Sequence, residues 1–147
     1  MVILVDTNIV IDAVSCREPY AENANRILEK CASREVTGFI AAHSISNLFY
    51  ILRKNFSIEE RKSLLKDLCT VFHISDLDEK KILSALDNKL FVDFEDCLQE
   101  ECAAGIIADY IVTRNPKDYK YSRVKVIQPD ELLALLEDNR GNTDENN

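Results

Sequence analysis

Acidic side chains in three short segments are the residues of this sequence best suited to chemistry. Asp6 lies in the segment VDTN, Asp93 and Asp96 lie in DFED, and Asp118 lies in TRNPKDY. Carboxylates that converge repel one another, which raises pKa values and costs stability. A bound Mg²⁺ or Mn²⁺ removes that penalty, activates water and neutralises charge on a phosphodiester. If the three segments meet, they predict a hydrolytic site that holds a divalent ion.

Each segment also has a purely structural interpretation. Asp6 can form an Asx turn or cap a following helix. Asp93 is a favourable N-cap, and an acid in the first turn of a helix, such as Asp96, interacts well with the helix dipole. Asp118 can close the turn that Asn-Pro begins. The segments taken singly leave both interpretations open.

The spacing of apolar residues predicts alternating strands and helices that would position these acids. Strands are expected over 2–5, 36–40, 71–74, 110–112 and 124–127, and helices over 20–31, 43–54, 57–68, 76–86, 93–105 and 129–136. This order favours a parallel sheet flanked by helices, which binds ligands beyond the carboxyl ends of its strands. Asp6 directly follows the first strand, and TRNPKDY directly follows the strand over 110–112.

Length and composition are those of one globular domain. The chain has 147 residues, of which 46% are hydrophobic and 30% are charged. We expect a single domain over residues 1–137 and an acidic, disordered tail over 138–147. No apolar run approaches the roughly 18 residues of a membrane helix, so no membrane contact is expected. Five cysteines without C-x-x-C spacing predict free thiols in a reducing cytoplasm.

The three motifs together resemble the PIN-domain family of ribonucleases, many of which are toxins of bacterial toxin–antitoxin pairs. They are VDTN at the first strand, DFEDCLQEECA on a later helix and IVTRNPKDY after a following strand, and the resemblance spans about residues 1–136. It implies a Rossmann-like, three-layer α/β/α sandwich with a mainly parallel central sheet. It also implies a Mg²⁺ or Mn²⁺ site and cleavage of single-stranded RNA in the cytoplasm.

The resemblance assigns a role to each acid by its motif. Asp6 matches the metal ligand after the first strand, Asp96 matches the helix acid, and Asp118 matches an acid of the last motif. These three residues are therefore expected to be catalytic. Asp93 lies beside Asp96 and is expected to join them as a metal ligand.

Four polar residues are expected to support the acids, and one of them departs from the family pattern. Asn8, Thr113 and Asn115 match polar positions of the first and last motifs. Asn47 stands where the family usually has an acid on a helix. An asparagine carbonyl can bind a metal ion but supplies no charge, so metal affinity should be weaker. A catalytically impaired module that binds RNA or protein is therefore the alternative.

The charge distribution bears on an RNA substrate. The net charge of −8 repels nucleic acid on average. The stretch 113–125, however, carries one acid against five bases: Arg114, Lys117, Lys120, Arg123 and Lys125. We expect Arg114, Lys117 and Lys120 to contact phosphates, although they can equally be solvated surface charges. Tyr119 and Tyr121 can stack on unpaired bases or pack in the protein.

Partners and a third function class complete the hypotheses. The resemblance implies an antitoxin protein, and exposed faces of the early helices could bind it or form a homodimer. A nucleotide-binding domain of the flavodoxin type is disfavoured because the sequence has neither a G-x-G-x-x-G motif nor a P-loop lysine.

Overall fold

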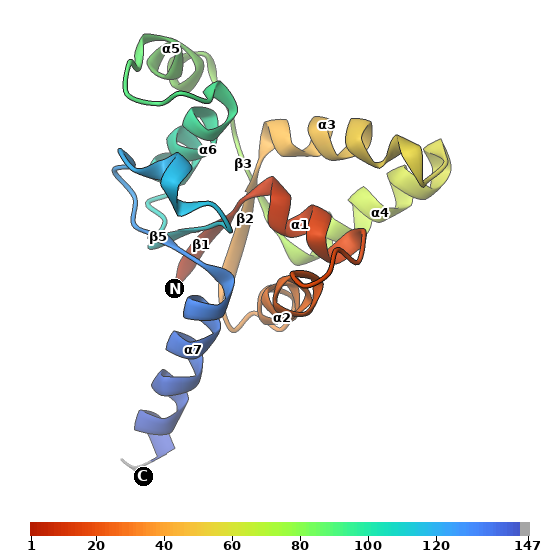
Figure 1. Ribbon diagram of the computed structural model, residues 1–147, viewed down its shortest axis with the longest axis vertical. Helices are drawn as coiled ribbons and strands as arrows, with labels where there is room; N and C mark the ends of the chain where they lie inside the picture. Colours follow the sequence, from red (N-terminus) through yellow and green to blue (C-terminus); the bar gives the residue numbers. More distant parts are fainter. Residues whose placement is uncertain (145–147) are drawn as a thin grey trace.

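The structure is a computed structural model that describes residues 1–144. Its described part contains one parallel sheet in the order β3-β2-β1-β4-β5 (Figure 1). The strands are β1 (Val2–Val5), β2 (Thr37–Ala41), β3 (His73–Ser75), β4 (Tyr110–Val112) and β5 (Val126–Ile127). The predicted parallel sheet is confirmed, and the bounds of β1 and β4 agree with the expected ones.

Helices cover both faces of the sheet because the side chains of β1 alternate between them. Ile3 and Val5 pack into one apolar cluster, and Leu4 packs into the other. The first cluster is completed by α1 (Thr7–Val14), α2 (Ala21–Ala32), α3 (Ala42–Ile51), α4 (Ile58–Val71) and α7 (Pro129–Asp144). The second is completed by α6 (Phe94–Gly105), with α5 (Glu79–Asp87) packed against α6. The result is the predicted three-layer α/β/α sandwich.

Helix starts follow the capping chemistry of the sequence. Ser57 and Glu60 form a reciprocal capping box at α4, with bonds of 3.2 Å and 2.8 Å. Asp93 caps α6 by accepting the backbone N–H of Asp96 at 3.1 Å. The expected start at Asp76 is wrong, since Asp78 caps α5.

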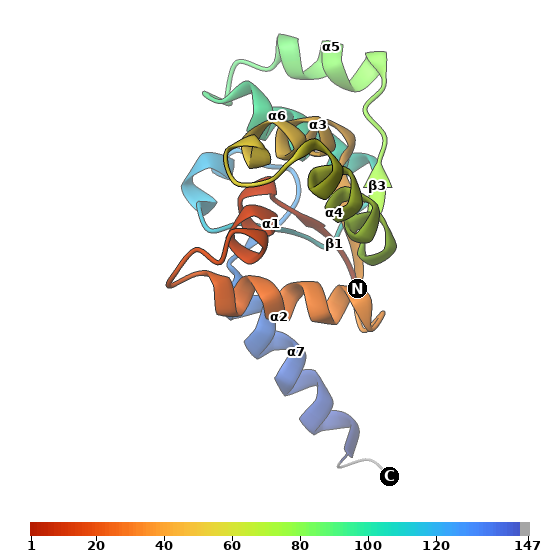
Figure 2. The same ribbon diagram turned by 90° about the vertical axis from the view of Figure 1, so that its right-hand side faces the viewer.

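Several parts of the structure differ from the expected elements. The strand expected over 71–74 is β3 over His73–Ser75, because α4 continues to Val71. Helix α1 was not predicted, because Ile9–Ala13 are all buried and give no amphipathic period. The helix expected over 43–54 ends at Ile51 and continues as the 3₁₀ turn η1 (Leu52–Lys54). Helix α7 runs to Asp144, into the expected tail, and residues 145–147 lie outside the described residues (Figure 2). The domain limit at 137 stays a prediction.

The topology creates a switch point between β1 and β4. The chain moves outward from β1 to β2 and β3 and then returns to β4 on the other side of β1. Val5 pairs with Val112, and the backbone N–H of Asp6 donates to the carbonyl of Val112 at 3.0 Å. Asp6 and Thr113 therefore leave neighbouring strands at the edge where doubly wound sheets bind ligands. Within residues 1–144, no helix is long and apolar enough to span a bilayer.

Candidate active site

Asp6 is both a helix cap and a buried acid, so its two interpretations are compatible. Its side chain caps α1 by accepting the N–H of Asn8 at 3.4 Å, and the Thr113 hydroxyl donates to its other oxygen at 2.7 Å. Only 4% of Asp6 is exposed. Burial raises the pKa of this carboxyl, and the charge of Asp118 adds to the rise, while the two hydrogen bonds oppose it.

Asp96 lies in the first turn of α6, where it interacts electrostatically with the other acids. Burial raises its pKa to about 7, and the charges of Asp93, Asp6 and Asp118 add to the rise. The Tyr119 hydroxyl donates to Asp96 at 3.3 Å and opposes part of it. The carboxylates of three separate segments thus form one electrostatic cluster, which consists of Asp6, Asp93, Asp96 and Asp118.

The loop after β4 brings Asp118 to this cluster. Thr113 is fully buried, and its hydroxyl oxygen accepts the backbone N–H of Asn115 at 3.1 Å. Asn115 then precedes the 3₁₀ turn η2 (Pro116–Tyr119), which carries Asp118 on its exposed side. Because Thr113 also donates to Asp6, one hydroxyl connects the loop to the acid at the end of β1.

A cavity of about 420 Å³ lies beside the acid cluster. The acids that line it are Asp93, Asp96 and Asp118, and the bases are Lys117 and Lys120. Lys117 and Lys120, two of the predicted RNA contacts, therefore share one surface with the acids.

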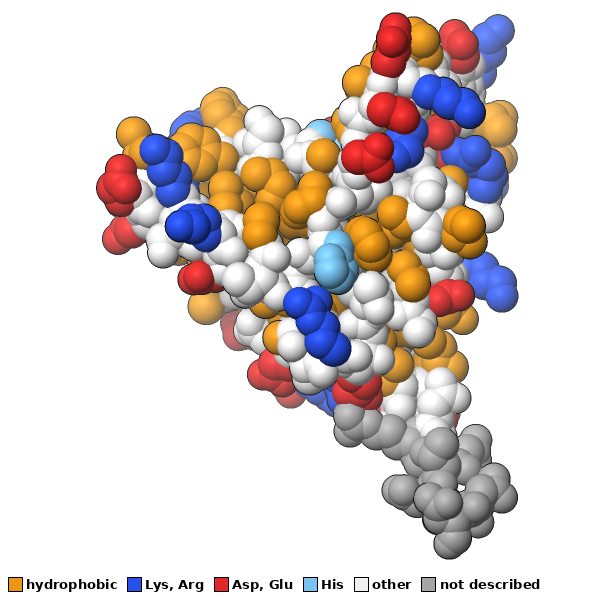
Figure 3. All heavy atoms as spheres, turned by 180° about the vertical axis from the view of Figure 1, so that it is seen from behind, with side chains coloured by type: hydrophobic (Ala, Val, Ile, Leu, Met, Phe, Trp, Pro, Cys, Tyr) orange, Lys and Arg blue, Asp and Glu red, His pale blue; other side chains and the backbone are white. Residues whose placement is uncertain are grey.

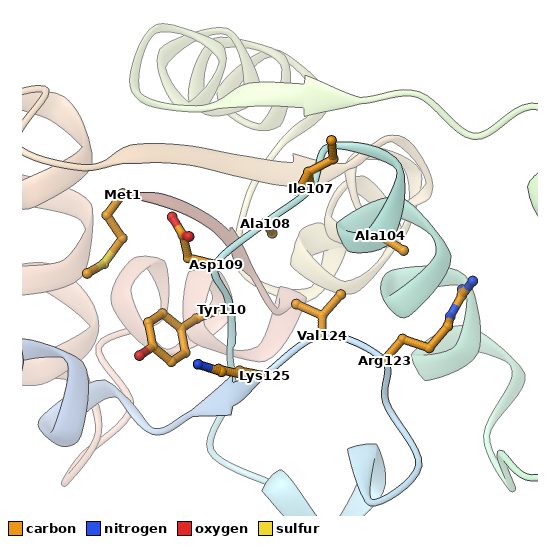
Figure 4. Close-up of a pocket in the computed structure, with 9 residues that line it drawn as sticks. All are labelled: Met1, Ala104, Ile107, Ala108, Asp109, Tyr110, Arg123, Val124 and Lys125. Carbon is orange, nitrogen blue, oxygen red and sulfur yellow. The ribbon is translucent and has the colours of Figure 1, made fainter.

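A larger hollow of about 730 Å³ lies elsewhere (Figure 4). Its lining includes Met1, Asp109 and Lys125, which precede β1, β4 and β5. It is therefore at the amino ends of these strands, on the edge away from the acids.

Arg114, the third predicted RNA contact, is held by protein groups. Its guanidinium forms a two-point ion pair with Asp12, which is completely buried on α1. It also lies 4.0 Å from the centre of the Tyr20 ring. These contacts tie the loop after β4 to α1 and to the start of α2.

A buried polar cluster that the sequence did not predict lies behind the acids. The Gln99 amide donates to the hydroxyls of Thr7 at 2.9 Å and Ser44 at 3.4 Å, and these two hydroxyls lie 2.7 Å apart. Gln99 follows Asp96 by three positions on α6, which is the helical spacing that could have identified it.

Three of the four predicted supporting residues, Asn8, Asn47 and Asn115, make no side-chain hydrogen bond within the described part of the chain. Asn8 and Asn115 donate only their backbone N–H groups, to Asp6 and Thr113 respectively. Glu95 was not predicted, yet its pKa is raised by burial and by the charges of Asp93 and Asp6, so it belongs beside the cluster.

A divalent ion is compatible with these residues, but the acids do not form a closed cage. Among residues 1–144 there is no group of three or more His, Cys, Asp or Glu side chains arranged to hold a metal ion. Mg²⁺ commonly keeps several waters and binds proteins through one or two carboxylates. Burial and the neighbouring acids raise the pKa values of Asp6 and Asp96, so a positive ion beside them would favour their charged forms. The acid cluster therefore fits a largely hydrated ion.

Comparison with known proteins identifies the family. The family model described as "PIN domain" matches residues 2–117. The chain belongs to the PIN-domain family. No curated relative matches its sequence. The matched residues include Asp6, Asp93 and Asp96, and their last residue is Lys117, one position before Asp118.

Solved structures of PIN proteins share the fold at low sequence identity. VapBC2 from Rickettsia felis, bound to a promoter DNA fragment, has 21% identity and a TM-score of 0.68 over 87% of this chain and 98% of that one. VapBC-1 from nontypeable Haemophilus influenzae has 15% identity and a TM-score of 0.67, over 88% of this chain and 99% of that one. VapC20 from Mycobacterium tuberculosis, a toxin that cleaves the sarcin-ricin loop, has 13% identity and a TM-score of 0.62, over 84% of this chain and 98% of that one.

Proposed function

We propose that this PIN-domain protein is a divalent-metal-dependent endoribonuclease that hydrolyses phosphodiester bonds in single-stranded RNA. The supporting observation is the electrostatic coupling of Asp6, Asp96 and Asp118 at the carboxyl edge of the sheet. PIN domains generally use divalent metal ions, and the structural relative from Mycobacterium tuberculosis is a toxin that cleaves the sarcin-ricin loop.

The acids share one part in the proposed reaction. Asp6, Asp96 and Asp118 would hold Mg²⁺ or Mn²⁺, assisted by Asp93. The ion would supply an activated water and positive charge near the phosphodiester. Thr113 orients Asp6 through its 2.7 Å hydrogen bond.

The remaining polar and basic residues serve the same site. Lys117 and Lys120 hold RNA phosphates at the rim of the cavity. Asn47 offers only an uncharged carbonyl oxygen, so the ion is held more weakly than by an acid at that position. Asn8 and Asn115 are proposed as further polar residues that support the acids.

Replacement of single acids tests this proposal. Asp6→Asn and Asp96→Asn should each slow Mn²⁺-dependent cleavage of a labelled single-stranded RNA by at least about 100-fold, because even residues behind the ligands of a metal change activity by 10–100-fold. Asp67→Asn, which changes an exposed acid on α4, is the matched control and should cut at the wild-type rate. Circular dichroism checks that all variants fold. Asp6 and Asp96 variants that cut normally would refute the assignment.

A binding module without catalysis is the second candidate, and Asn47 is the residue that favours it. Such a module would bind RNA or a protein while failing to bind Mn²⁺ at millimolar concentration. Calorimetric titration of Mn²⁺ therefore separates the two functions.

We also propose an antitoxin partner and a homodimer. Support comes from VapBC assemblies among the structural relatives and from exposed apolar side chains on α3 and α4, namely Tyr50, Ile51 and Ile58. Figure 3 shows hydrophobic side chains gathered on the rear face of the molecule. Light scattering that gives a monomer mass at every concentration would contradict the homodimer.

A further inference from the structure

The cavity beside the acid cluster has an exposed apolar wall that the proposed chemistry leaves unexplained. Leu90 and Val92 line the cavity from the loop between α5 and α6, and Tyr121 lines it from the turn after η2. These side chains are 58%, 104% and 52% exposed, respectively. Apolar side chains so open to water favour a flat apolar ligand that covers them, because burial of their surface lowers the free energy.

The two tyrosines of this region have different environments. Tyr119 is 2% exposed and donates its hydroxyl to Asp96, so its ring is part of the core. Tyr121 is half open and keeps its ring at the cavity, with the Lys120 ammonium 5.3 Å from the ring centre. Tyr119 is therefore the tyrosine that packs in the protein, and Tyr121 is the one free to stack on a base. The sequence had left both roles open for both residues.

We infer that Tyr121, together with Leu90 and Val92, forms a base-binding subsite for one unpaired nucleotide next to the scissile phosphate. The inference rests on the proposed function and adds a specificity-determining residue to it. Lys117 and Lys120 line the same cavity and meet the phosphates, whereas the apolar wall meets the face of the base. A paired base does not offer its face, so the subsite selects single strands.

Binding experiments with and without bases test this inference. All proteins carry Asp96→Asn so that RNA stays intact, and no divalent ion is added. The probes are a short, labelled oligouridylate and an abasic ribose–phosphate oligomer of equal length and charge. Adding Tyr121→Leu should weaken oligouridylate binding by about 5- to 150-fold, the range for loss of one base–aromatic stack. Abasic oligomer binding should not change, and Tyr121→Phe should bind like the parent.

A second exposed tyrosine provides the matched control. Tyr50 on α3 is 63% exposed and also has a cationic partner, since Arg53 lies 3.6 Å from its ring centre. Tyr50→Leu should change neither affinity. If Tyr121→Leu binds oligouridylate like the parent, or if it weakens the binding of both probes equally, the base subsite is refuted while RNA binding stands. If the parent binds neither probe, the base subsite is refuted, whereas the Mn²⁺-dependent cleavage assay of the wild type still decides the proposed function separately.

Discussion

At the scale of single residues, the burial of Asp96, which we propose as a metal ligand, makes its charged form unfavourable in the absence of an ion. Its carboxyl lies among Asp6, Asp93 and Asp118, and its pKa of about 7 shows that the fold disfavours the charged form. A positive ion would reverse this preference. Strain of this electrostatic kind is typical of functional sites.

The stability of Asp96→Asn should reveal this cost through its pH dependence. The folded pKa is raised above the unfolded value of 3.8, so ionisation removes stability as pH rises from about 4 to about 7. Asparagine cannot ionise and still accepts the Tyr119 hydrogen bond. At pH 8 in the presence of a chelator, we expect the free energy of unfolding of Asp96→Asn to exceed that of the wild type by about 2 kcal/mol. This value allows for solvent screening of the charge.

Urea denaturation at pH 8 and pH 4 measures this difference. The gain should vanish at pH 4, where wild-type Asp96 is protonated. Asp67→Asn should show no gain at either pH. A loss of stability for Asp96→Asn that is equal at both pH values would contradict the electrostatic origin.

The sequence could identify the acids but not the groups behind them. Asp6, Asp96 and Asp118 stand in motifs. Strand ends place Asp6 and Asp118 at one sheet edge, and the first turn of α6 adds Asp96. Gln99 and Asp12 stand in runs of buried residues. The role of a polar residue in such a run becomes visible only through its partner in another part of the chain. Such partners are long-range contacts that no local pattern encodes.

At the scale of elements, the ion pair between Asp12 and Arg114 holds the loop after β4 against α1. Asp12 is completely buried, so its charge depends on the guanidinium for compensation. The loop that this pair anchors also carries Asp118. We therefore expect Arg114 to position the acid cluster, and its predicted contact with RNA stays a prediction.

Arg114→Met should lower the free energy of unfolding by about 3–5 kcal/mol, because it leaves a buried carboxylate unpaired. The double variant Asp12→Leu/Arg114→Met should recover most of that loss, since it removes both charges. Urea denaturation of the three proteins makes the comparison. Equal stabilities of the single and double variants would show that the buried charge is not the cause.

Elements with a clear period or cap could be predicted, and those without one could not. The capping box at Ser57 and the cap at Asp93 identified their helices. Helix α1 was missed because its apolar residues face both the sheet and other helices. Gly38 in β2 shows the same limit, since a Cβ there would lie 2.5 Å from the Cys31 sulfur on α2, a close approach visible only in three dimensions.

At the scale of the whole molecule, the topology reconciles an acidic protein with the proposed anionic substrate. The sheet order places the ends of β1 and β4 side by side, and α6 and η2 add their acids and lysines at that edge. The net charge of −8 therefore includes acids that a bound ion would neutralise. Local charge at the site, and not the average charge, decides whether RNA binds.

Calorimetric titration of Mn²⁺ into the wild-type protein at pH 8 tests the central claim most directly. We predict that the wild type binds Mn²⁺, that Asp6→Asn and Asp96→Asn lose this binding, and that Asp67→Asn retains it. Asn47→Asp should bind more tightly, because it restores a charge. A wild-type protein that binds no Mn²⁺ at millimolar concentration, or an Asp96→Asn variant that binds as well as the wild type, would contradict a shared divalent-cation site.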